Sequence, residues 1–400
     1  MSLDWTGRTL ELTVGAVAHG GHCVARVDGR VVFVRHALPG ERVLAEVTED
    51  TGKSFCRADA VRVLTPSPDR VEPPCPVAGP GLCGGCDWQH ATGRAQRELK
   101  ARVVEEQLSR LAGLDLPVTV EELPGGLLRW RTRVRFVADA EGRAGLRAHR
   151  SHRVVPLADC PITVRGAVDA VLPERWPAGD EIEATEDADG EVHVRRLPGR
   201  GKRPERRRGG VAVQRAAGRD WRLAAHGFWQ VHPEAADTFA RVVGEWAQAS
   251  PGARAWDLYA GVGLFAAVLA EQVGPSGRVL AVESGRRAVS DGKANLADLR
   301  QVSWRCGQVE HVLRDRRDSP EVVVLDPPRK GAGRQVVERI AAAGPERVVY
   351  VACDPAALAR DVATFAGRGY RLARLRAFDA FPMTHHVECV ALLERVGTGD

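Results

Sequence analysis

The chain has 400 residues, of which 44% are hydrophobic and 27% are charged, and its formal net charge is +5. This composition is that of an ordinary globular protein, and the length exceeds what one hydrophobic core usually serves, so we expect two or three domains. No run of about 18 uninterrupted apolar residues occurs, and the amino terminus lacks the apolar segment of a signal peptide. We therefore expect no membrane span and a cytoplasmic location.

The nine cysteines are scattered along the chain and odd in number. This pattern argues against a disulfide framework and favours a reducing compartment. In such a compartment, cysteines that cluster usually bind metal or take part in catalysis.

Residues 1–66 predict a small all-β domain, because apolar and polar residues alternate through short runs. In the stretch HCVARVDGRVVFVRH, Asp28 and Gly29 stand between two β-rich runs, which is a strong signal for a hairpin with a type I′ turn. Five short strands in this length favour a barrel of the OB-fold class, which often binds oligonucleotides. The proline-rich stretch TPSPDRVEPPCP then predicts a linker.

Residues 67–222 predict a central domain of mixed α+β structure. A cysteine-rich segment is followed by a helical pattern in ATGRAQRELKARVVEEQLSRLAG and then by short strands and turns. Between Arg195 and Arg222 the chain carries eleven Lys or Arg against two acidic residues. This basic run is either a solvated loop or a patch that contacts phosphates, and the sequence leaves both open.

Four cysteines of the central domain have the spacing of a metal site. They are Cys75, Cys83, Cys86 and Cys160, with a C-x2-C pair in the middle. Four thiolates fit either structural zinc or an iron–sulfur cluster, and the spacing alone does not choose between them.

Residues 223–400 alternate between helical and strand patterns. The apolar runs RVLAVE, EVVVLDPP and RVVYVACDP each end in polar or turn residues. Such runs, separated by helices, predict a doubly wound, mostly parallel α/β sheet of the Rossmann type. Ligands of these folds bind outside the carboxyl ends of the strands.

The stretch AWDLYAGVGLFAAVLAEQ predicts a strand, a glycine-rich turn and a helix. Gly261 and Gly263 let the backbone approach a ligand, and Glu283 ends the next strand at the position of a ribose-binding carboxylate. The spacing also fits the dinucleotide pattern G-x-G-x-x-G/A, so a nicotinamide-dependent oxidoreductase is one alternative. With Asp257 ahead of the turn, the pattern D-x-x-x-G-x-G resembles instead the first motif of S-adenosylmethionine-dependent methyltransferases.

The next strands lead to candidate catalytic residues. One ends in Asp326 within DPPR, which resembles the substrate-facing motif of the same superfamily. The following strand leads into Cys353, with Asp354 as a helix N-cap and Pro355 at the first helical position. A thiol beside a helix N-terminus has a lowered pKa, so we expect an activated cysteine, the alternative being a small buried residue. Glu388 enters an otherwise apolar strand, where a carboxylate is costly unless it is paired or used.

A thiol, a carboxylate and a methyl donor together indicate one reaction. Carbon 5 of uracil becomes nucleophilic when a thiolate adds at carbon 6, and a base must then remove the proton at carbon 5 so that the thiolate can leave. Simple oxygen or nitrogen methylation needs no nucleophilic cysteine. Cys389 is a rival thiol, but it lies on the strand face opposite to Glu388, so we expect it in the core.

With these motifs the chain resembles the RNA uracil-C5 methyltransferases, which form 5-methyluridine in transfer or ribosomal RNA. Its amino-terminal barrel resembles the TRAM domain of that family. The stretch FWQVHPEAADTF resembles the family's Phe-x-Gln motif, with Gln230 at a cofactor-contacting position. The resemblance also implies cofactor or substrate contacts for Tyr259, Glu283 and Asp326.

For the catalytic pair, the resemblance implies that Cys353 is the nucleophile and Glu388 is the base. Asp354 departs from the family, whose members often carry Asn there, and its charge opposes thiolate formation. The four clustered cysteines are implied to hold a [4Fe–4S] cluster, with zinc as the other possibility. The expected partner is ribosomal or transfer RNA with a base flipped out of its stack, and no obligate protein partner is evident. A noncatalytic RNA-binding protein that keeps the fold is a further alternative.

Overall fold

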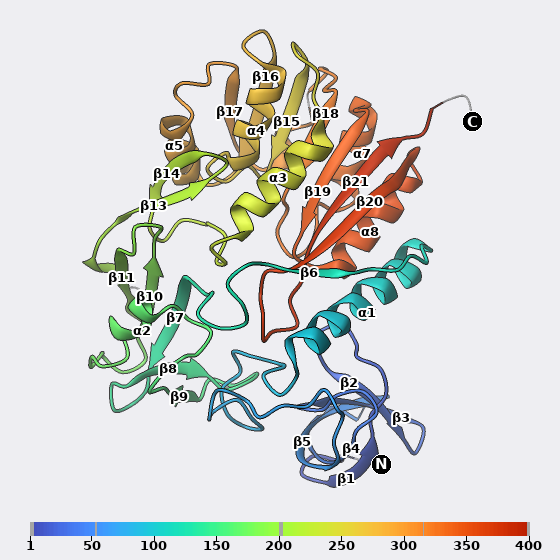
Figure 1. The fold of residues 1–400 in the computed structure, drawn as a ribbon, viewed down its shortest axis with the longest axis vertical. Coiled ribbons are helices and arrows are strands. Elements are labelled where there is room, and N and C mark those ends of the chain that lie inside the picture. Colours follow the sequence, from blue (N-terminus) through green and yellow to red (C-terminus); the bar gives the residue numbers. More distant parts are fainter. Residues whose placement is uncertain (1–3, 53, 200–202, 315, 398–400) are drawn as a thin grey trace.

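The computed structural model describes residues 4–52, 54–199, 203–314 and 316–397, which fold into three parts (Figure 1). A small barrel contains the amino-terminal segment, a central sheet lies beside it, and a large α/β domain contains the carboxyl-terminal segment. Among the helices described, none is both long and apolar enough to cross a membrane.

The barrel has five strands in the order β1-β4-β5-β3-β2. They are β1 (Thr9–Thr13), β2 (Cys23–Val27), β3 (Arg30–Arg35), β4 (Arg42–Asp50) and β5 (Phe55–Thr65). Asp28 and Gly29 have φ values of 48° and 77° and connect β2 to β3, as the predicted primed turn requires. The backbone of Gly15 and Ala16 hydrogen-bonds to Val24, which connects the chain after β1 to β2. The predicted β-barrel is confirmed.

The central sheet has six strands in the order β12-β11-β10-β7-β8-β9, all antiparallel to their neighbours. They are β7 (Arg133–Ala138), β8 (Ala144–Arg147), β9 (Val154–Pro156), β10 (Glu181–Glu186), β11 (Val192–Leu197) and β12 (Glu205–Arg208). Helix α2 (Arg165–Asp169) packs against β10. A separate hairpin of β13 (Val211–Ala216) and β14 (Arg219–Ala224) packs against helices of the α/β domain.

The α/β domain contains an eight-stranded sheet in the order β17-β16-β15-β18-β19-β21-β20-β6. The strands are β6 (Val120–Glu122), β15 (Arg254–Leu258), β16 (Arg278–Glu283), β17 (Val302–Cys306), β18 (Val322–Leu325), β19 (Arg347–Ala352), β20 (Tyr370–Asp379) and β21 (Glu388–Arg395). The strands from β17 to β19 in this order are parallel, and β21 enters antiparallel between β19 and β20. The apolar runs fill the middle of the sheet because both of its faces are covered.

Helices cover the two faces of this sheet and produce two hydrophobic cores. The helices are α3 (Ala235–Ala247), α4 (Leu264–Val273), α5 (Arg286–Asn295), α6 (Val309–Val312), α7 (Arg334–Ala343) and α8 (Pro355–Ala366). Val349 and Val351 of β19 pack toward α3 and α4, whereas Val348 and Tyr350 pack toward α7 and α8. This confirms the predicted doubly wound α/β domain.

Helix α1 (Gly93–Ala112) extends from the barrel to the α/β domain (Figure 1). It begins where the Thr92 hydroxyl accepts a hydrogen bond from the N–H of Ala95, and it ends at Gly113, whose φ is 66°. Although α1 and β6 precede most of the central sheet in sequence, α1 packs on α8 and β6 pairs with β20. The segment between the barrel and the central sheet thus contributes to the α/β layer.

Candidate active site

The glycine-rich turn after β15 is tight. Tyr259, Gly261 and Gly263 have φ values of 64°, 55° and 94°, and the first of these is costly for a bulky residue. A side chain at Gly263 would collide with Trp304, because an ideal Cβ there lies 3.0 Å from atoms of the indole ring. The turn therefore needs glycine, and it keeps the backbone bare where a nucleotide-like ligand approaches.

Glu283 ends β16 beside this turn. Its Oε2 accepts a hydrogen bond from the N–H of Gly261 at 3.0 Å, and its Oε1 accepts one from the N–H of Gly285 at 2.6 Å. A carboxylate that backbone donors fix at the carboxyl end of a strand is suited to bind the hydroxyl groups of a ribose.

Two further carboxyl groups lie at the same edge of the sheet. Asp257 of β15 is fully buried, and this burial raises its pKa to about 8. Asp326 follows β18, its N–H donates to the carbonyl oxygen of Leu258 at 3.2 Å, and burial raises its pKa to about 7. Both groups can therefore hold a proton near neutral pH, so that Asp326 can donate as well as accept a hydrogen bond.

Cys353 and Glu388 come together across two neighbouring strands. Cys353 directly follows β19, and Glu388 is the first residue of β21. In the antiparallel pairing of these strands Ala352 lies opposite Cys389, so the register continued by one residue sets Cys353 opposite Glu388. Cys389 is fully buried in the core on the α8 side of the sheet, whereas its neighbour Val390 packs on the other side.

The surroundings of Cys353 and Glu388 favour their neutral forms. Burial raises the pKa of the Cys353 thiol to about 12, the carboxyls of Glu388 and Asp326 act in the same direction, and Arg329 opposes them. Burial also holds the pKa of Glu388 well above its usual range, again with Asp326 adding and Arg329 opposing. The lowered thiol pKa expected from the helix N-terminus is therefore wrong, because burial and the neighbouring carboxyls raise the pKa of Cys353.

Arg329 is the cation of this site. It lies in the DPPR motif, and its guanidinium is 3.2 Å from Nε2 of His386. Burial lowers the pKa of His386 to about 3, so the ring is neutral and its Nε2 accepts a hydrogen bond from Arg329. Arg329 was not predicted as a site residue, although a cation directly after a carboxylate motif is a signal that the sequence contains.

The loop before Glu388 is held by the cysteine-rich segment. Met383 has a φ of 67°, and its carbonyl oxygen accepts hydrogen bonds from the N–H groups of Asp87 and Trp88 at 2.9 and 3.0 Å. The Asp87 carboxylate lies 2.7 Å from Nδ1 of His385, and Gln96 of α1 accepts a hydrogen bond from the N–H of Met383 at 2.7 Å. The segment around Cys86 thus fixes the loop that leads into Glu388.

The four predicted metal ligands, Cys75, Cys83, Cys86 and Cys160, line one small cavity. Donors point at two of the sulfur atoms: the N–H of Gly85 lies 3.4 Å from Sγ of Cys83, and the Thr163 hydroxyl lies 3.2 Å from Sγ of Cys160. Such donors are common around thiolates that bind metal.

The spacing of these sulfur atoms bears on the kind of metal. A tetrahedral zinc with bonds of about 2.3 Å holds its sulfur ligands roughly 3.8 Å apart. Within the described ranges, no three of the four sulfur atoms lie within 4.8 Å of one another. As described, the four thiols therefore do not form the close tetrahedral arrangement of a single zinc ion.

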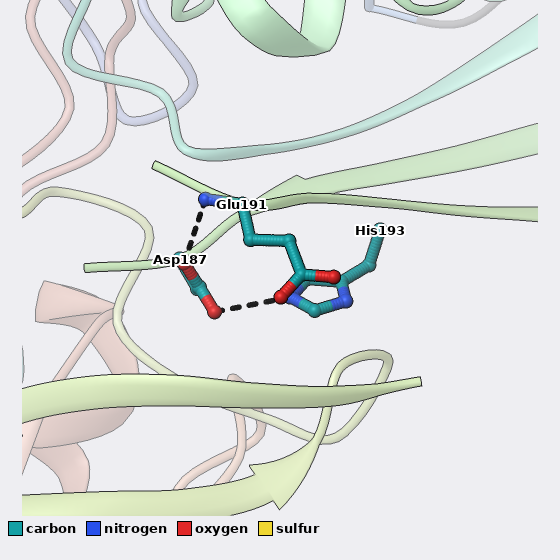
Figure 2. A group of neighbouring side chains, drawn as sticks. All are labelled: Asp187, Glu191 and His193. Carbon is teal, nitrogen blue, oxygen red and sulfur yellow. Dashed lines mark hydrogen bonds and ion pairs between the residues drawn. The ribbon is translucent and has the colours of Figure 1, made fainter. Parts of the chain in front are cut away.

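A second group of possible metal ligands lies in the central domain and consists of Asp187, Glu191 and His193 (Figure 2). Asp187 accepts hydrogen bonds from the N–H groups of Glu191 and Val213, and its Oδ2 lies 3.1 Å from Nε2 of His193. Nδ1 of His193 accepts a hydrogen bond from the N–H of Gly210. Because both ring nitrogens and both carboxylate oxygens have partners, this group closes a β-turn and supports no metal site.

Gln230 is predicted to contact the cofactor, but it lies in a different segment from the glycine turn. It lies between β14 and α3, where it borders a small cavity together with Thr132 and Trp229. In the part of the chain that the structure describes, no hydrogen bond joins its side chain to the glycine turn or to Glu283. Its role as a cofactor contact stays a prediction.

Family models match several parts of the chain. A family model described as tRNA (Uracil-5-)-methyltransferase matches residues 313–396, which include Cys353 and Glu388. A TRAM domain model matches residues 5–61. A model described as Protein-L-isoaspartate(D-aspartate) O-methyltransferase matches residues 233–315, the part with the glycine turn.

Curated relatives match nearly the whole chain and are described as uncharacterized RNA methyltransferases. The one from Streptomyces coelicolor is 49% identical over 98% of this chain and 94% of its own length. Those from Streptomyces avermitilis and Bifidobacterium longum are 48% and 40% identical, over 98% and 96% of this chain and 100% and 96% of theirs.

Among solved structures, the chain is similar to the crystal structure of Pyrococcus abyssi tRNA (uracil-54, C5)-methyltransferase in complex with S-adenosyl-L-homocysteine. The TM-score is 0.73 at 21% identity, over 96% of this chain and all of that chain. At this identity the likeness concerns the fold, which includes the barrel, the central sheet and the α/β domain.

Proposed function

Because the chain belongs to the RNA uracil-C5 methyltransferase family, we propose that it transfers a methyl group from S-adenosylmethionine to carbon 5 of a uridine in RNA through a covalent cysteine intermediate. The observation that carries this proposal is the register that sets Cys353 opposite Glu388 at the rim formed by the glycine turn and Asp326. Family membership also argues against the alternative that the chain is a nicotinamide-dependent oxidoreductase whose glycine turn binds that cofactor.

In the proposed reaction, the Cys353 thiol gives its proton to water and its sulfur bonds to carbon 6 of uracil, which makes carbon 5 nucleophilic. S-adenosylmethionine, when bound, supplies the electrophilic methyl group that carbon 5 takes. Glu388 must be ionised for the next step, in which its carboxylate accepts the proton from carbon 5, the ring double bond returns, and the sulfur leaves carbon 6. In its ionised form, Glu388 is a stronger proton acceptor than an exposed carboxylate, because its pKa is raised.

The residues proposed for the methyl donor are those of the glycine turn and its surroundings. Gly261 and Gly263 supply bare backbone, and Glu283 supplies a fixed acceptor for ribose hydroxyls. Tyr259 and Gln230 complete the set on the family resemblance. Asp326 lies nearer to Cys353 and is placed to bind the polar edge of the uracil ring, since it can donate or accept a hydrogen bond.

The four clustered cysteines are proposed to hold a [4Fe–4S] cluster. The cavity that all four cysteines line and the donors aimed at Cys83 and Cys160 support a metal site there, and the choice of iron over zinc rests on the family resemblance. The role proposed for the cluster is structural, because the Asp87–Trp88 backbone, directly after Cys86, holds the loop that leads into Glu388.

Transfer RNA is the first substrate to test, since the matching family model and the similar solved structure are both named for it. The purified protein is incubated with labelled S-adenosylmethionine and unmodified transfer or ribosomal RNA, and the nucleosides are analysed. We expect 5-methyluridine from the wild type and from Cys389→Ser, and none from Cys353→Ala. Binding of RNA without any methyl transfer by the wild type would support the noncatalytic alternative and overturn the proposal.

A further inference from the structure

A loop of the barrel reaches the nucleophile. Nε2 of His19, between β1 and β2, lies 3.0 Å from Oδ2 of Asp354, the residue after Cys353. We propose that His19 is a positioning residue that balances the charge of Asp354 beside the nucleophile and connects the barrel to the active site. The proposal rests on the proposed role of Cys353.

The loop that carries His19 is seated firmly. It turns through Gly20 and Gly21, with φ values of 94° and 81°, and the N–H of Ala18 donates to the carbonyl oxygen of His22. The indole N–H of Trp88 donates to the carbonyl oxygen of Gly21 at 3.1 Å. His19 therefore approaches Asp354 from a fixed turn.

Gly21 also lies against the loop that leads into Glu388. An ideal Cβ at Gly21 would lie only 2.7 Å from Cβ of His385, so glycine is needed for this contact. The barrel loop thus touches both sides of the active site, Asp354 through His19 and the base loop through Gly21.

Asp354 has two tasks, one for each oxygen. Oδ1 accepts a hydrogen bond from the N–H of Ala357 at 2.8 Å and caps α8, while Oδ2 faces His19. Burial alone raises the pKa of Asp354, but the hydrogen bonds from His19 and Ala357 outweigh it and lower the pKa. Asp354 is therefore an anion at neutral pH, and it contributes to the raised pKa of Cys353.

The charges around His19 favour its protonated form. The hydrogen bond with Asp354 raises the pKa of His19, burial opposes it, and the other charged groups nearby are Arg360 of α8 and Glu106 of α1. The ion pair is thus present below the raised pKa of His19 and is lost as the pH rises through it. A protonated His19 makes the pair with Asp354 neutral overall, which removes the obstacle that Asp354 poses to a Cys353 thiolate.

Alkylation of Cys353 by iodoacetamide tests this role without RNA or cofactor. Cys353 is the single cysteine of tryptic peptide 348–360, so mass spectrometry follows it separately. In the full-length protein near pH 7, we expect His19→Ala to slow the reaction about threefold to tenfold, since one unit of thiol pKa changes the thiolate fraction about tenfold. His152→Ala removes an exposed histidine outside this contact and should leave the rate unchanged.

A second substitution distinguishes an effect of the Asp354 charge from an unfolding of the loop that carries His19. Asp354→Asn keeps a side chain that caps a helix but removes the charge. Added to His19→Ala, it should restore the wild-type alkylation rate, whereas a merely unfolded loop would not recover. A wild-type rate in His19→Ala, or no recovery in the double variant, would overturn the proposal. Because alkylation needs no methyl transfer, this outcome is independent of whether Cys353 proves to be the nucleophile.

Discussion

Glu283 accepts a hydrogen bond from the backbone N–H of Gly261 at 3.0 Å, so the end of β16 holds the turn that follows β15. The same carboxylate accepts a second bond from Gly285. A ligand hydroxyl that binds Glu283 therefore meets an acceptor that is already oriented, and ligand binding does not have to order the side chain.

The first prediction concerns this carboxylate. Glu283→Ala should weaken S-adenosylmethionine binding by about 10-fold to 100-fold, because a hydrogen bond to a charged group contributes about 1.5–3 kcal/mol. Glu283→Gln keeps one acceptor oxygen and should have an intermediate affinity. Isothermal titration calorimetry measures both, with Glu271→Gln on the exposed side of α4 as the matched control. Equal affinities in all four proteins would remove Glu283 from the cofactor site.

This part of the site could be predicted from the sequence because its geometry is local. A strand, a glycine turn and a helix follow one another in the sequence. Gly263 has no side chain, and this leaves room for the indole ring of Trp304 to pack against the turn. The hairpin at Asp28 and Gly29 was predicted for the same reason, since turns that need positive φ values favour a few residue pairs such as Asp-Gly.

The second prediction separates Glu388 from Cys353. Glu388→Gln should still permit attack by Cys353 and methyl transfer, but the proton at carbon 5 would remain, and loss of a positioned base typically costs about 10² to 10⁴ in rate. The enzyme should accumulate as a protein–RNA adduct that survives denaturing gel electrophoresis. Cys353→Ala should give no adduct, and Cys389→Ser should behave as the wild type. Normal turnover by Glu388→Gln would leave the base unidentified.

The third prediction concerns the metal. Protein purified without oxygen should be brown and contain about four iron atoms per chain, as expected for a [4Fe–4S] cluster. Replacing Cys83 with Ser should remove the iron and loosen the loop before Glu388, which hydrogen exchange at Met383 and His385 measures. Cys306→Ser, at an exposed cysteine outside the group, should keep the iron. About one zinc and no iron would reject the cluster but keep the metal site.

The fourth prediction concerns the basic run. Arg206, Arg207 and Arg208 are exposed on the edge strand β12, whereas Arg195 is paired with Glu183; Arg200 and Lys202 lie outside the described residues. Replacing the three exposed arginines with Ser should weaken RNA binding.

The triple variant should also flatten the dependence of log K on log salt. Each lost phosphate contact lowers the slope by about 0.7–0.9. Filter binding between low and moderate salt measures both quantities. The matched control replaces three exposed arginines of the α/β domain, Arg241, Arg334 and Arg371, with Ser. If the two triple variants have the same RNA affinity and the same salt dependence, the three arginines of β12 are solvated side chains that do not contact phosphates.

Contacts between distant segments could not be predicted in this way. His19 and Asp354 are separated by 335 positions, and neither the histidine nor its neighbours form a pattern that indicates a partner. The thiol pKa was misjudged because the helix N-terminus is visible in sequence, whereas the desolvation of Cys353 and its proximity to Glu388 depend on how two strands pair. The same limit applies to Lys100, which looks like a surface residue of an ordinary helix.

The fifth prediction concerns Lys100 of α1 and Asp379 of β20. Both side chains are fully buried, and Nζ lies 2.5 Å from Oδ1 of Asp379 and 3.0 Å from the carbonyl oxygen of Phe381. Burial lowers the pKa of Lys100, and Asp379 opposes this effect. Lys100→Met leaves a buried carboxylate unpaired and should cost about 3–5 kcal/mol of unfolding free energy, measured by chemical denaturation.

Replacing both Lys100 and Asp379 distinguishes the loss of an ion pair from a disturbance of side-chain packing. In Lys100→Met with Asp379→Leu no charge stays buried, so much of the stability should return. Arg97→Met is the matched control on the same helix, because its partner Glu122 is half exposed and a surface pair contributes less than about 1 kcal/mol. If Lys100→Met lowers the free energy of unfolding as little as Arg97→Met does, the buried pair does not hold α1 to the sheet. The attachment of α1, and of the barrel from which it extends, must then depend on apolar contacts.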